Sequence, residues 1–129
     1  MRPLLTLLAF LFVVPVAAQE IPSPEAFFGH KMGADRELAH WDQLVEYYHL
    51  LDRSSERLTV VEAGLSTMGN PFLVLYITSP ENQANLAGLK AMNATLTDPR
   101  YATAEAIEAA IAGGKAVVTQ SYGLHSSEV

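Results

Sequence analysis

The sequence contains no cysteine among its 129 residues. This absence excludes disulfide bonds and thiolate metal sites, so any metal must be held by histidine and carboxylate side chains. Basic residues are also scarce, with 8 Lys and Arg against 14 Asp and Glu and a formal net charge of −6 at pH 7. Because no Lys/Arg cluster is present to neutralise phosphates, the composition argues against a nucleic-acid partner and against binding to an anionic membrane surface.

Only one long apolar run exists, over residues 4–16, after a positively charged start at Arg2. Small residues at 16–18 and polar residues at 19–20 follow it, which is the arrangement of a cleavable secretory signal. A transmembrane anchor is the alternative, but the run is shorter than the roughly 20 residues needed to span a bilayer. We therefore expect a signal peptide over residues 1–18, cleaved after Ala18, a secreted or periplasmic protein, and no stable membrane insertion after cleavage.

Apolar periodicity predicts a first helix over residues 36–52, with Asp35 as its N-cap. The apolar positions recur at the spacing of one helix face, namely Trp41, Leu44, Val45, Tyr48 and Leu51. Ahead of this helix, prolines and glycines interrupt residues 19–36, which predicts a leader and loop. The segment 25–30 within it is expected to be a loop or short turn that holds two buried aromatic residues.

Two β-branched or apolar stretches follow, at residues 58–63 and 72–78. The segment 64–70 between them is rich in glycine, serine and threonine, so we expect a turn and an antiparallel hairpin. Because the second stretch is apolar almost throughout, it predicts a strand buried on both faces of a sheet.

The remaining pattern is helical and then extended. A serine, a proline and an acid at 79–81 predict the start of a helix that runs to residue 95. Thr103 is the expected cap of an alanine-rich helix through residue 111, and residues 115–121 predict a third strand. The fold class is therefore α/β, with a mixed sheet, an antiparallel hairpin and flanking helices. So few strands leave such a sheet incomplete, which itself predicts a truncated domain.

The residues best placed for chemistry are His125 and Glu128, just after the expected third strand. Sites in open α/β sheets form beyond the carboxyl ends of strands, and Gly123 allows a sharp turn there. An imidazole and a carboxylate are both zinc ligands, although a catalytic zinc needs three protein ligands and a water. The alternative is that both side chains are simply exposed at a chain end. His49 and Asp52 have the same spacing, but they lie mid-helix and are interpreted as surface structure.

A family resemblance adds weight to the zinc hypothesis. The segment Gly123-Leu124-His125-Ser126-Ser127-Glu128 resembles the Gly-Ile-His-x-x-Glu segment of zinc carboxypeptidases. Residues 62–72 are similar to that family's strand, Gly-x-Ser-x-x-Gly-x-Pro segment and second strand. The leader at 24–30, the helix at 38–51 and the stretch at 114–118 also resemble family segments. The likeness thus covers nearly all of the chain after residue 18, and the leader at 24–30 looks like that of large secreted bacterial members.

The resemblance implies a Zn²⁺-dependent metallocarboxypeptidase that hydrolyses peptide bonds in a peptide or protein substrate. It implies that residues 37–129 are the N-terminal part of the catalytic domain, and that His125 and Glu128 are its first two zinc ligands. The family's third ligand, a His, lies far downstream, as do its general-base Glu and its substrate-binding residues. We therefore expect no catalytic residue within this chain, and no activity from the chain alone.

Two further functions remain open at this point. The first is a zinc-dependent deacylase or amidase on the same scaffold, which only the specificity residues would separate from a peptidase. The second is a non-catalytic secreted module that binds a protein or folds only with a partner. The missing third ligand and the incomplete sheet favour this last alternative for the chain as given. The sequence does not distinguish cleavage from the C-terminus from internal cleavage, and it leaves the oligomeric state open.

Overall fold

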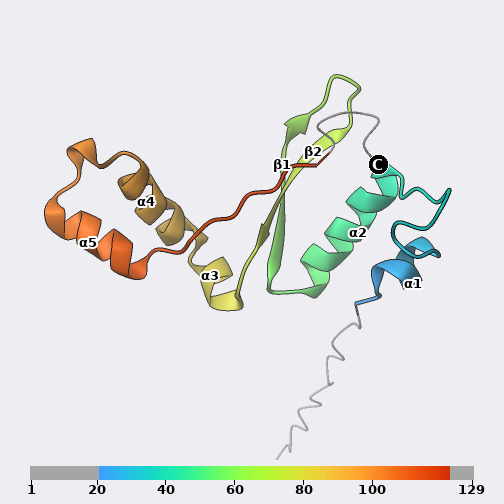
Figure 1. Cartoon of the computed structure of the whole chain (residues 1–129), viewed down its shortest axis with the longest axis horizontal. Helices are drawn as coiled ribbons and strands as arrows, with labels where there is room; N and C mark the ends of the chain where they lie inside the picture. Colours follow the sequence, from blue (N-terminus) through green and yellow to red (C-terminus); the bar gives the residue numbers. More distant parts are fainter. Residues whose placement is uncertain (1–20, 123–129) are drawn as a thin grey trace, which may run out of the picture.

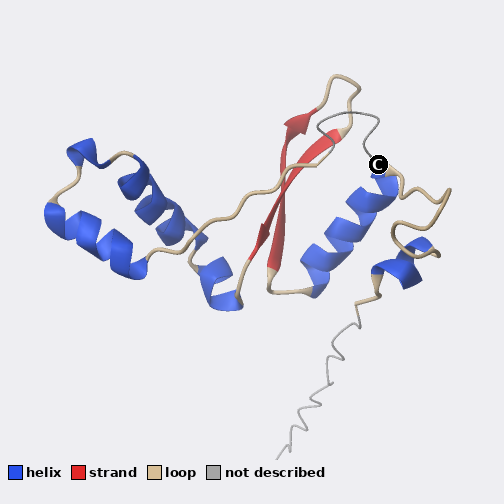
Figure 2. Cartoon of the chain, in the orientation of Figure 1, coloured by secondary structure: helices blue, strands red, loops and turns tan. Residues whose placement is uncertain are grey.

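The computed structural model describes residues 21–122, which form helices and one small antiparallel sheet (Figures 1 and 2). No helix in this part of the chain is long and apolar enough to cross a membrane. The elements in chain order are α1 (Pro24–Phe28), α2 (Trp41–Ser54), β1 (Leu58–Leu65), β2 (Pro71–Ile77), α3 (Pro80–Ala84), α4 (Leu86–Thr97), the short 3₁₀ helix η1 (Pro99–Tyr101) and α5 (Ala104–Gly113).

Helix α1 forms where a loop or turn was expected. Ser23 Oγ accepts the backbone N–H of Ala26 at 3.2 Å, Pro24 occupies the first turn, and Gly29 ends the helix in the left-handed region at φ 78°. These are ordinary start and stop signals of a helix. The prediction of an irregular segment was therefore wrong here.

The aromatic residues of α1 pack on Tyr47 of α2. The ring centroids of Phe27 and Phe28 lie 4.8 and 5.5 Å from that of Tyr47. Tyr47 is only 7% exposed, and its hydroxyl donates a hydrogen bond to the carbonyl oxygen of Pro22 at 2.9 Å. The two phenylalanines are half-buried rather than buried. This cluster attaches the leader segment to the face of α2.

Helix α2 begins at Trp41, later than the residue 36 that periodicity predicted. Arg36 has a φ of 64°, and a left-handed residue cannot continue a right-handed helix. The N-cap position is therefore His40 rather than Asp35, and the backbone N–H of His40 donates to Gln43 Oε1 at 3.3 Å.

The predicted antiparallel hairpin is confirmed. Strands β1 and β2 pair from Leu58 opposite Ile77 to Leu65 opposite Pro71, with a bulge between Glu62 and Gly64. Helix α2 packs against β1. The prediction that β2 is buried on both faces was wrong. The sheet has two strands in the described residues, and Phe72 and Ile77 are 62% and 72% exposed.

The helix expected over residues 80–95 is divided into α3 and α4 at Asn85, whose φ of −118° and ψ of 25° leave the helical range. Gln83 ties α3 to the hairpin, since its amide donates to the Tyr76 carbonyl oxygen at 2.7 Å and accepts from the Thr59 hydroxyl at 3.2 Å. Lys90 of α4 places its ammonium 4.4 Å from the centre of the Tyr76 ring. These polar contacts hold the helical segment to β2 at one end.

Helix α5 forms as predicted, with Thr103 Oγ1 accepting the N–H of Ala106 at 3.2 Å. It packs on α4, and Ala110 is 3% exposed. The prediction of a third strand at residues 115–121 was wrong, because these residues form no strand in the described part of the chain. Val117 and Val118 are 67% and 86% exposed, so their β-branched side chains lack the packing that makes a strand favourable. Helices and a small antiparallel sheet are thus established.

Candidate functional site

The two predicted zinc ligands, His125 and Glu128, lie outside the described residues, as does the predicted signal peptide at 1–18. Their roles therefore stay predictions. What the structure describes is the approach to them, an extended segment that runs from the end of α5 toward the hairpin (Figure 1). The pKa of Tyr48 is raised, mainly by burial and secondarily by the nearby ionisable hydroxyl of Tyr122.

Within residues 21–122 no group of three His, Asp or Glu side chains is arranged to hold a metal ion. The histidines in this range have other surroundings. His30 Nδ1 lies 3.2 Å from the carbonyl oxygen of Lys31, and His40 is the residue at the start of α2. Neither was predicted as a ligand, and the described part of the chain supplies no complete alternative to the pair at 125 and 128.

His49 and Asp52 share the spacing of the candidate pair, but each makes a separate contact with β1. His49 Nε2 lies 3.5 Å from Glu62 Oε1, with side chains 31% and 60% exposed. Asp52 Oδ1 accepts the backbone N–H of Val60 at 3.2 Å. The interpretation of this pair as structure is consistent with these contacts, because both residues join α2 to the hairpin. The sequence did not reveal Glu62 as the partner of His49. The alternation of side chains along β1 places Glu62 on the same face as Leu58 and Val60.

The Gly-x-Ser-x-x-Gly-x-Pro segment has a geometric role in closing the hairpin. Gly64 lies at the bulge with φ 138°, and Gly69 has φ 79°. Ser66 Oγ accepts the N–H of Asn70 at 3.1 Å, and the carbonyl oxygen of Ser66 accepts the N–H of Gly69 at 2.9 Å. Both glycines adopt conformations that side chains disfavour. These residues therefore shape the turn, and none of these contacts requires a chemical role.

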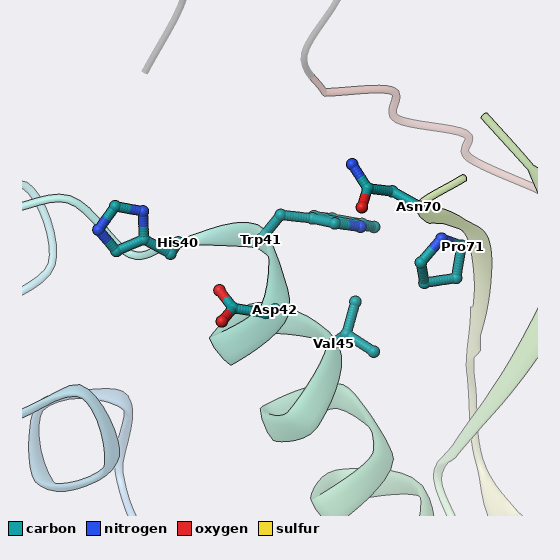
Figure 3. Close-up of a pocket in the computed structure, with 6 residues that line it drawn as sticks. All are labelled: His40, Trp41, Asp42, Val45, Asn70 and Pro71. Carbon is teal, nitrogen blue, oxygen red and sulfur yellow. The ribbon is translucent and has the colours of Figure 1, made fainter. Parts of the chain in front are cut away.

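An open cavity of about 410 Å³ lies between the start of α2 and the start of β2. Figure 3 shows the indole of Trp41 extending across it toward Asn70 and Pro71, while the imidazole of His40 points the other way. Val45 and Asp42 complete the lining. Trp41 is 40% exposed, so the indole offers an apolar surface. The lining contains no hydroxyl or thiol nucleophile, so it has no pair of nucleophile and base for covalent catalysis.

Comparisons with protein-family models, curated proteins and solved structures found no match to this chain.

Proposed function

We propose that this chain is the N-terminal portion of a zinc-dependent metallocarboxypeptidase that hydrolyses peptide bonds. The observation that carries the proposal is the segment Gly123-Leu124-His125-Ser126-Ser127-Glu128, which has the ligand pattern of zinc carboxypeptidases. The helix, strand, tight turn and strand that precede it follow the order of the segments that resemble the family.

The available side chains are of the right kind for zinc but too few. Imidazole and carboxylate are both zinc ligands, and the chain has no cysteine to offer a thiolate. When bound in such a site, zinc polarises the scissile carbonyl and lowers the pKa of a bound water. His125 would bind as a neutral imidazole, with its other ring nitrogen fixed by an acceptor, and Glu128 as a carboxylate ligand rather than the general base.

The proposal requires a third ligand and a general base from sequence that follows Val129. The test is to read the coding sequence past the Val129 codon and to express the whole reading frame. We expect a downstream His and Glu, zinc bound at one equivalent, and release of C-terminal residues from peptides that stops when a chelator removes the metal. A stop codon directly after Val129 would overturn the proposal, as would a complete protein that neither binds zinc nor cleaves peptides.

The same experiment separates the peptidase from a deacylase or amidase on the same scaffold. The peptidase releases free amino acids from unmodified peptides, whereas the deacylase acts on acylated amino acids and leaves those peptides intact. Replacement of His125 by Ala in the expressed protein abolishes either activity, because both reactions need the same metal. Hydrolysis that survives this replacement contradicts the assigned ligand.

A further inference from the structure

We draw no further inference here: the strongest candidate, the cavity between the start of α2 and the start of β2 that the Trp41 indole crosses, is open only with respect to residues 21–122, and nothing in the structure shows what covers it.

Discussion

Asp52 Oδ1 lies 3.2 Å from the backbone nitrogen of Val60 and occupies the outer edge of β1 from its place on α2. Replacing Asp52 by Ala removes this acceptor and leaves the Val60 N–H without its partner. We expect the free energy of unfolding to fall by about 1 kcal/mol. Chemical denaturation measures this loss.

Asp42→Ala is the matched control for this change, because Asp42 lies at the opposite end of the same helix from Asp52. It should lower the free energy of unfolding by less than Asp52→Ala does. Equal losses in the two variants would mean that the hydrogen bond from the Val60 N–H to Asp52 does not stabilise the hairpin.

Gln83 is predicted to hold α3 against the hairpin. Its side chain bonds both the Tyr76 carbonyl oxygen and the Thr59 hydroxyl, so Gln83→Ala should lower the free energy of unfolding by about 1–2 kcal/mol. Gln43→Ala removes one exposed hydrogen bond from the His40 N–H, so it should lower the free energy of unfolding by less than Gln83→Ala does. Denaturant titration of both variants provides the comparison, and equal losses would contradict the bridging role of Gln83.

Tyr47 is predicted to stabilise the leader through two separable contributions. Tyr47→Phe keeps the ring against Phe27 and Phe28 but removes the hydrogen bond to Pro22, which should cost about 1 kcal/mol. Tyr47→Ala also removes the ring and should cost about 3 kcal/mol. Thermal unfolding measures both. Identical losses from the two variants would show that ring packing contributes nothing.

The pKa of the exposed Glu81 carboxyl is held below its ordinary value, first by the hydrogen bond from the Ser79 side chain. A depressed folded-state pKa contributes stability above the ordinary carboxyl value of about 4.3 and loses it as pH falls through the lower folded-state pKa. Ser79→Ala should therefore raise the pKa of Glu81 and reduce this acid sensitivity.

A pH titration followed by carboxyl NMR signals measures the effect. Glu105 provides the internal control, because its pKa is lowered by its own backbone and by Thr103 and should not respond to Ser79. A Glu81 signal that titrates identically in wild type and Ser79→Ala would exclude the hydroxyl as the main cause.

Local signals in the sequence were reliable where they acted over a few residues. The hairpin followed from two apolar runs around a glycine-containing turn, and Thr103 capped α5 as predicted. The start of α1 carries the same Ser-Pro-Glu pattern at residues 23–25 that predicted the start of α3 at 79–81. This signal was available at the first position too and was overlooked there.

Other features depended on contacts that periodicity does not encode. Apolar spacing does not report that Arg36 is left-handed, so the start of α2 was placed too early. The β-branched residues at 117–119 favour a strand, but a strand forms only where another strand supplies its hydrogen bonds. The contacts of Glu62 and Gln83 likewise join elements distant in sequence. The ligand pair at 125 and 128 rests on the motif alone.

Titration of Zn²⁺ into residues 19–129, followed by calorimetry, tests the central claim most directly. We expect weak one-to-one binding, because two protein ligands are fewer than a stable site needs, and we expect His125→Ala and Glu128→Gln each to abolish it. His49→Ala should leave it unchanged, since His49 contacts Glu62 instead. Zinc binding that survives loss of His125, or no zinc binding by the unaltered chain, would contradict the assignment of these two residues as zinc ligands.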